Sequence, residues 1–154
     1  MEIQFTWKTK LFRIKYEIIQ NENIVGTLKG SGWKRKLPGE LKGRKILFVT
    51  KGFFKVKNLI KSAEDDSLIG EISFNTWKSK AVITVQDKVY YFQFDNFFHT
   101  KWNISNENGS LIKYNSRFRK GEIISYTADE VLILTGLYIR DFFRQRASAA
   151  AAAS

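Results

Sequence analysis

Apolar residues recur at every second position along much of this chain. Between Leu11 and Ile18, aromatic and aliphatic residues occupy the even positions, and charged residues occupy three of the odd ones. Successive side chains of a strand point to opposite faces of a sheet, so this spacing predicts a half-buried β-strand. The same reasoning predicts strands at Ile3–Trp7, Leu11–Gln20, Ile24–Lys29, Ile46–Thr50, Phe53–Ile60, Leu68–Phe74, Ala81–Gln86, Val89–Phe94, Lys101–Asn106, Leu111–Asn115 and Glu122–Tyr126.

The connections between these strands are short and rich in Asn, Asp and Gly, as at 20–23, 64–67, 86–88 and 106–109. Asn and Gly tolerate the positive φ angles that tight hairpins require. The chain is therefore predicted to form a largely antiparallel meander.

The last element follows a different pattern. Ala128-Asp129-Glu130 is a helix-start signal, and the run Val131–Ile139 that follows has no polar stripe. A helix that is apolar on all sides must be buried, and this run is shorter than the roughly 20 apolar residues that span a bilayer. Charged residues after the run are expected to return the helix to solvent and to suit its C-terminal dipole: Arg140, Asp141, Arg144 and Arg146.

A length of 154 residues predicts one domain, here 1–146. Ala147–Ser154 is of low complexity and is expected to be a disordered tail or a remnant of an expression vector. The absence of Cys removes disulfides and thiolate zinc sites, and a single His excludes mechanisms that need two. Met1–Lys15 has no apolar stretch suited to a signal peptide, so we expect a cytoplasmic protein, with peripheral membrane contact as an option.

Three segments share one pattern: an aromatic-headed strand, a polar turn, and a short strand that opens with two apolar residues. Phe12–Lys15 leads to Ile24–Leu28, Phe54–Lys57 leads to Leu68–Ile72, and Trp102–Ser105 leads to Leu111–Tyr114. The equivalent positions Gly26, Gly70 and Lys113 are spaced by 44 and 43 residues. This period fits propeller blades or the hairpins of a closed barrel, and three units are too few for most propellers.

Hairpins of this form, followed by one apolar C-terminal helix, resemble the tubby-like superfamily. That group includes the tubby C-terminal domain, the phospholipid scramblases and the LURP-one-related proteins. The resemblance covers about Leu11 to Arg144 and rests on Phe54–Ile72 and Trp102–Tyr114. It implies an antiparallel barrel of 11–12 strands around a buried helix, Val131–Phe143.

The resemblance implies less about function. Tubby domains bind phosphoinositides and scramblases act at membranes, whereas the LURP-one-related branch has no settled activity. The calcium-binding segment and palmitoylated cysteines of the scramblases have no counterpart, since Glu64-Asp65-Asp66 lacks the loop spacing and Cys is absent. Scrambling is therefore not expected.

Positive charge is concentrated at one end of the sequence. The chain carries a formal net charge of +11, and all of this excess lies before Ser62. The densest stretch is Trp33–Lys45, which Leu37-Pro38-Gly39 interrupts, so a long basic loop is expected there. Such a loop attracts anionic partners, and a Trp beside a Lys suits a membrane interface. The predicted lipid-binding residues are Trp33, Lys34, Arg35, Lys36, Lys42, Arg44 and Lys45.

The leading hypothesis is thus a non-enzymatic module that binds anionic phospholipid or phosphoinositide surfaces. The other Trp–Lys adjacencies, at Trp7, Trp77 and Trp102, are expected to pair a core ring with a solvated charge. A protein-interaction or structural domain stays open, as does single-stranded nucleic-acid binding through Lys55 and Lys57.

No catalytic motif, cofactor or metal is expected. The lone His99 is flanked by aromatic residues and is more typical of packing than of general base catalysis. Strand topology could bring carboxylates together, and the candidates are Glu71, Asp95 and Glu122, but the sequence does not distinguish them from solvent-facing charges.

Overall fold

The computed structural model describes residues 1–10, 13–30, 35–52 and 54–153. It contains twelve strands and one helix. The strands are β1 (Ile3–Lys10), β2 (Arg13–Gln20), β3 (Asn23–Gly30), β4 (Lys36–Leu41), β5 (Arg44–Lys51), β6 (Lys57–Ser62), β7 (Leu68–Asn75), β8 (Lys80–Val85), β9 (Lys88–Phe94), β10 (Lys101–Asn106), β11 (Gly109–Asn115) and β12 (Lys120–Ser125). The helix is α1 (Glu130–Ala153).

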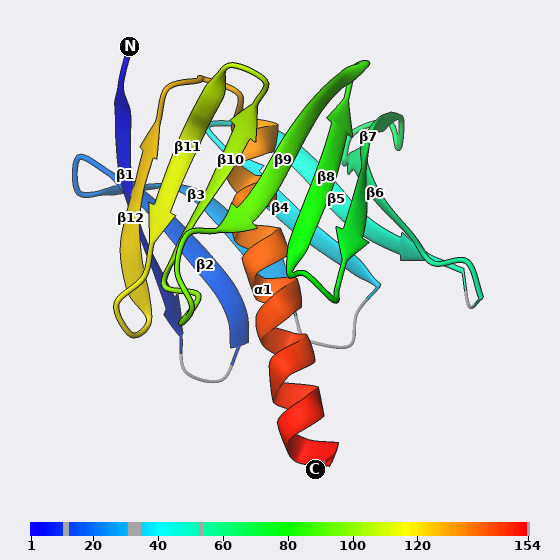
Figure 1. Cartoon of the computed structure of the whole chain (residues 1–154). Coiled ribbons are helices and arrows are strands. Elements are labelled where there is room, and N and C mark those ends of the chain that lie inside the picture. Colours follow the sequence, from blue (N-terminus) through cyan, green and yellow to red (C-terminus); the bar gives the residue numbers. More distant parts are fainter. Residues whose placement is uncertain (11–12, 31–34, 53, 154) are drawn as a thin grey trace.

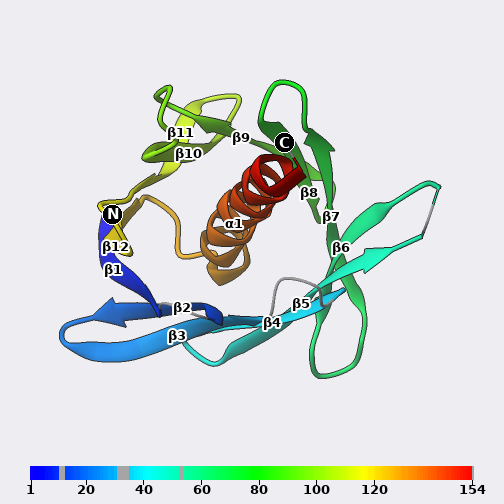
Figure 2. The same cartoon turned by 90° about the horizontal axis from the view of Figure 1, so that it is seen from below.

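Each strand pairs in antiparallel fashion with its neighbours in sequence, and β1 pairs with β12 to close a barrel. The prediction of an all-β barrel around a C-terminal helix is confirmed. Figure 1 shows α1 running through the barrel, and Figure 2 shows the strands surrounding it when the molecule is viewed from below.

An up-and-down barrel places alternate connections at opposite ends. The connections β5–β6, β7–β8, β9–β10 and β11–β12 lie at the end where α1 leaves the barrel, which we call the helix-exit end (Figure 1). The last residues of β1 and β3 and the first residues of β2 and β4 lie at the same end. The connections β2–β3, β4–β5, β6–β7, β8–β9 and β10–β11, and the one from β12 into α1, lie at the helix-start end. Residues far apart in sequence therefore gather at one end of the molecule.

The strand β4 is absent from the sequence prediction, because Leu37-Pro38-Gly39 suggested a loop. The Thr50 N–H donates to the Arg35 carbonyl at 2.8 Å, and Lys36–Leu41 continues this ladder with β5. In an antiparallel ladder the bonded positions alternate, so the nitrogen of Pro38 faces β3. Pairing with β3 begins only at Gly39, so the missing N–H of proline removes no ladder bond.

The signal for the start of α1 is confirmed at atomic detail. Asp129 Oδ1 accepts hydrogen bonds from the backbone N–H groups of Val131 (3.0 Å) and Leu132 (3.3 Å), as an N-cap does.

At the C-terminal end of α1, the predicted tail Ala147–Ser154 is instead helical as far as Ala153. Alanine has the highest helix propensity, and the helix is already nucleated inside the barrel.

The three hairpins of the predicted repeat are β2–β3, β6–β7 and β10–β11. Each contains a register shift just after a buried isoleucine: Ile18, Ile60 and Ile104. These residues pair with Gly26, Gly70 and Ile112. The hairpins therefore repeat in the ladder, but the predicted alignment of the third unit is wrong. Ile112, not Lys113, is equivalent to the two glycines, and Trp102 precedes its isoleucine by two residues whereas Phe54 precedes Ile60 by six.

Candidate functional site

The structure divides the predicted basic loop into two groups. Arg35 and Lys36 lie at the helix-exit end of β4, whereas Lys42, Arg44 and Lys45 lie around the β4–β5 turn at the helix-start end. Trp33 and Lys34 lie outside the described residues. Because β4 has six residues and a strand rises about 3.3 Å per residue, the groups are about 20 Å apart. The prediction of one continuous loop is wrong, because the strand β4 separates the two groups.

Cations from much of the chain gather instead at the helix-exit end. Among the described residues, the connections there and the strand ends beside them carry exposed basic side chains: Arg35, Lys36, Lys51, Lys55, Lys57, Lys78, Lys80, Lys101, Arg117, Arg119 and Lys120. Arg144 and Arg146, both exposed as predicted, are added where α1 emerges. Asp95 is the one acidic side chain in the described parts of these connections.

The helix-start end has the opposite character. Its connections carry carboxylates on five of the six turns: Glu22, Glu64, Asp65, Asp66, Asp87, Glu107 and Asp129. The exception is the β4–β5 turn with Lys42, and the strand ends beside these turns add the exposed basic side chains of Arg44, Lys45 and Lys88. The barrel is therefore polarised along the helix axis, positive at the helix-exit end and mainly negative at the helix-start end.

The two ends also differ in their aromatic residues. Every exposed Phe or Trp of the described chain lies in a helix-exit connection: Phe54, Trp77, Phe97, Phe98 and Phe118. The prediction of a core ring is confirmed for Trp7 and Trp102, but it is wrong for Trp77, which is 93% exposed. Trp77 lies in the turn between β7 and β8, where strand alternation does not apply.

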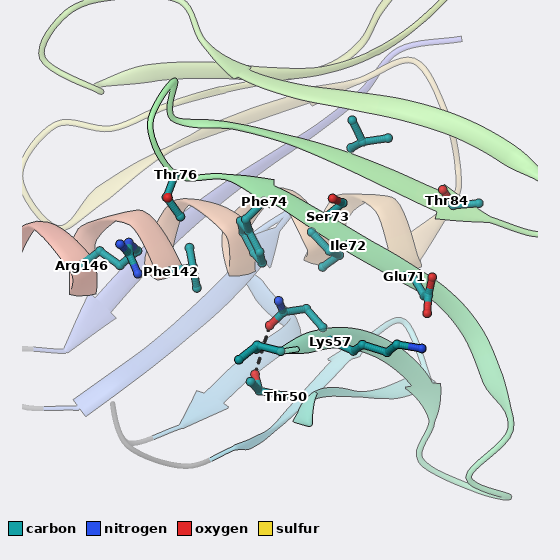
Figure 3. Close-up of a pocket in the computed structure, with 13 residues that line it drawn as sticks. Thr50, Lys57, Glu71, Ile72, Ser73, Phe74, Thr76, Thr84, Phe142 and Arg146 are labelled. Atoms are coloured by element: carbon teal, nitrogen blue, oxygen red, sulfur yellow. Dashed lines mark hydrogen bonds between the residues drawn. The ribbon is translucent and has the colours of Figure 1, made fainter. Parts of the chain in front are cut away.

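A cleft of about 530 Å³ opens beside the helix-exit end (Figure 3). It forms because the β6–β7 ladder ends at the pair Asn58 and Ile72, and the strands separate beyond it. Phe74 and Phe142, stacked at 3.8 Å, form its apolar side, and the Thr50 hydroxyl donates to Asn58 Oδ1 at 3.2 Å on its polar side. Its lining is thus mixed, and sequence alternation gave no signal for it.

Two charged residues of α1 are buried, contrary to prediction. The Arg140 guanidinium lies 5.0 Å from the Trp7 ring and 5.1 Å from the Trp102 ring, so the rings take the place of solvent. Its Nη1 donates to the Tyr16 hydroxyl at 3.0 Å, and that hydroxyl donates to Asp141 Oδ1 at 3.4 Å. These contacts attach α1 to β1, β2 and β10.

The carboxyl of Asp141 gives this cluster a pH dependence. Burial raises the pKa of Asp141, and hydrogen bonding by Gln145 partly opposes the rise. Between the ordinary value of about 3.9 and the raised native pKa, the folded protein holds more protons than the unfolded chain. The contribution of Asp141 to the free energy of unfolding should therefore fall as pH rises through this window.

Asp141→Asn removes that titration and tests the sign. Urea denaturation at each pH gives the free energy of unfolding of the wild type and of the variant. We expect the difference, wild type minus variant, to decrease from pH 3 to pH 7. A difference that increases with pH would show instead that an ion pair dominates the cluster.

The candidate catalytic groups are not assembled. Glu71 lies on β7, Asp95 follows β9 and Glu122 lies on β12, and the strand register pairs none of them with another. His99 stacks on Phe94 with ring centroids 3.8 Å apart, as expected of a packing residue. In the described ranges, no three His, Asp or Glu side chains come close enough to hold a metal ion.

No family model matches the sequence, and neither the curated proteins nor the solved structures give a match. Over the described parts of the chain, no helix has both the length and the apolar character needed to cross a membrane.

Proposed function

We propose that this protein binds peripherally to anionic phospholipid surfaces through its helix-exit end. The observation that carries the proposal is the separation of charge between the two ends of the barrel. An anionic surface can face all the described helix-exit connections together, because they lie at one end of one closed barrel and only the end of α1 extends past them (Figure 1). The acidic turns then face away from the membrane.

The expected contribution of each cation is modest, so the number of cations that reach the surface decides the affinity. A Lys or Arg near an anionic membrane contributes about 1 kcal/mol, and this contribution falls off within a Debye length of about 8 Å at physiological salt. Lys55 and Lys78 lie in the connections themselves, whereas Lys42 and Arg44 lie at the opposite end.

Two charge-matched variants test the proposal by co-sedimentation with phosphatidylserine-containing vesicles. Changing Lys55 and Lys78 together to Gln should weaken binding about 30-fold, which corresponds to about 2 kcal/mol. Changing Lys42 and Arg44 together to Gln removes the same charge from the other end and should change the affinity far less. Vesicles of phosphatidylcholine alone should bind weakly in every case.

The same assay separates the alternatives. Equal losses in the two variants would show that net charge, not the helix-exit end, governs binding. If no anionic vesicle binds at low salt, the proposal is wrong. Salt-sensitive binding of a single-stranded oligonucleotide without vesicle binding would instead favour a nucleic-acid partner.

A further inference from the structure

Resting on the proposed function, we infer that the exposed aromatic side chains of the helix-exit end insert into the bilayer. The barrel then stands on the membrane with α1 directed toward it. The fitting partner is an anionic membrane whose outer layer is loosely packed, as in strongly curved vesicles.

The first step is the position of the rings. Phe54, Trp77, Phe97, Phe98 and Phe118 are between 81% and 102% exposed, and they come from β5–β6, β7–β8, β9–β10 and β11–β12. Closure of the barrel places these connections around the point where α1 emerges (Figure 2). Rings on four hairpin tips at one end can contact one surface together. A single exposed ring is common on protein surfaces and does not by itself indicate a binding site.

Structured turns hold these rings out. Asn96 Oδ1 accepts hydrogen bonds from the N–H groups of Thr100 (2.9 Å) and Lys101 (3.2 Å), which closes the loop that carries Phe97 and Phe98. The Lys78 N–H donates to Asn75 Oδ1 at 3.1 Å and fixes the turn that carries Trp77. The exposure of these rings is therefore a property of the folded turns.

Phe118 adds an observation from the backbone. Its φ is +60°, in the left-handed region that favours glycine or asparagine and is strained for a bulky residue. A bridge between Arg117 and Lys120 closes this turn and leaves Phe118 90% exposed. The strained residue at the tip gains no packing in the barrel, which fits a role outside it.

Charge complementarity indicates which partner binds the helix-exit end. Basic residues lie beside the rings in sequence, as Lys55 follows Phe54, Lys78 follows Trp77, and Arg117 and Arg119 flank Phe118. An aromatic ring at headgroup depth with a cation beside it is typical of membrane interfaces. A second copy of this chain docking through the same end would bring two positive surfaces together, so an anionic bilayer is the better match.

The emerging helix does not obstruct this arrangement. Beyond Arg146, α1 continues with alanine and one serine over residues 147–152 and extends past the hairpin tips (Figure 1). This segment carries no charged side chain, and the carbonyls of its last turn, which have no partner within the helix, can hydrogen-bond to water in the interface. It can enter the interface beside the rings.

The first test uses the wild-type protein and lipids brominated on their acyl chains, which quench tryptophan on contact. Trp77 should be quenched on vesicles of phosphatidylserine and phosphatidylcholine, and the quenching should fall in Trp77→Phe. Trp7 and Trp102 are fully buried and contribute little to the difference, and the comparison is repeated in a Trp33→Phe background to remove the remaining tryptophan. Quenching that Trp77→Phe leaves unchanged would overturn the inference.

The second test compares two changes from apolar or aromatic residues to threonine, on small and on large vesicles. Changing Phe97 and Phe98 together to Thr should weaken binding about tenfold or more and remove a preference for the small, curved vesicles. Changing Val89 and Tyr91, exposed on the barrel wall, together to Thr is the matched control and should leave binding unchanged. Circular dichroism checks that both variants fold.

The outcomes separate this inference from the proposed function. Salt-sensitive binding to anionic vesicles that is equal in both double variants, without quenching of Trp77, would overturn insertion and leave electrostatic binding in place. Failure of the wild type to bind any anionic vesicle would overturn both.

Discussion

Gly136→Ala is expected to lower the free energy of unfolding by about 2 kcal/mol, because a clash costing about 3 kcal/mol outweighs the gain of about 1 kcal/mol from alanine as the better helix former. A Cβ at position 136 would lie less than 3.0 Å from three atoms of the Tyr114 side chain. Tyr114 cannot easily retreat, because it is buried, stacks on Trp102 at 5.4 Å and donates its hydroxyl hydrogen to the Ile133 carbonyl at 2.9 Å. The helix contacts the barrel here through its own backbone.

Urea denaturation measures this effect, and a double-mutant cycle assigns its cause. Tyr114→Leu removes the ring that the new methyl group would strike, so Gly136→Ala should cost far less in that background. A Gly136→Ala variant as stable as the wild type would show that the ring and helix adjust without strain. An equal loss in both backgrounds would place the cause elsewhere than the contact with Tyr114.

The sequence predicted the strands, hairpins and helix because that signal is local, whereas the closed barrel was predicted from the hairpin repeat and from the resemblance to the tubby-like superfamily. Alternation with period two and polar turns identify strands and hairpins without knowledge of distant contacts, and Val131–Ile139 identifies a buried helix. The burial of Arg140 is different. It depends on Trp7 and Trp102, which lie more than 30 residues away and supply the ring faces that replace solvent. No local pattern marks such a partner.

The candidate site shows a second limit. Charge density along the sequence was taken as charge density in space, but a strand separates the two halves of Trp33–Lys45. Alternate connections of a meander lie at opposite ends of the barrel. A strand count without β4 would therefore place every later connection at the wrong end. With β4 in place, the chain from Ser62 onward, neutral overall, sends Lys78, Arg117 and Arg119 to one end and most of its turn carboxylates to the other.

Trp77 and Trp102, two of the three described tryptophans that the sequence placed alike in the core, should respond very differently to alanine. Trp102 is fully buried, and its Nε1 donates to the Gly136 carbonyl at 3.2 Å. Trp102→Ala should therefore lower the free energy of unfolding by about 4 kcal/mol, through the lost ring and the cavity it leaves. Trp77 is 93% exposed, so Trp77→Ala should change the free energy of unfolding by no more than about 0.5 kcal/mol.

Urea denaturation of both variants checks the contrast, with vesicle binding measured beside it. Trp77→Ala should retain wild-type stability and lose vesicle affinity, because its ring contacts nothing that holds the barrel together. A destabilisation of Trp77→Ala comparable to that of Trp102→Ala would mean that the ring packs on the protein. Stability and membrane affinity separate at these two positions because the barrel turns one tryptophan toward α1 and carries the other on a hairpin tip.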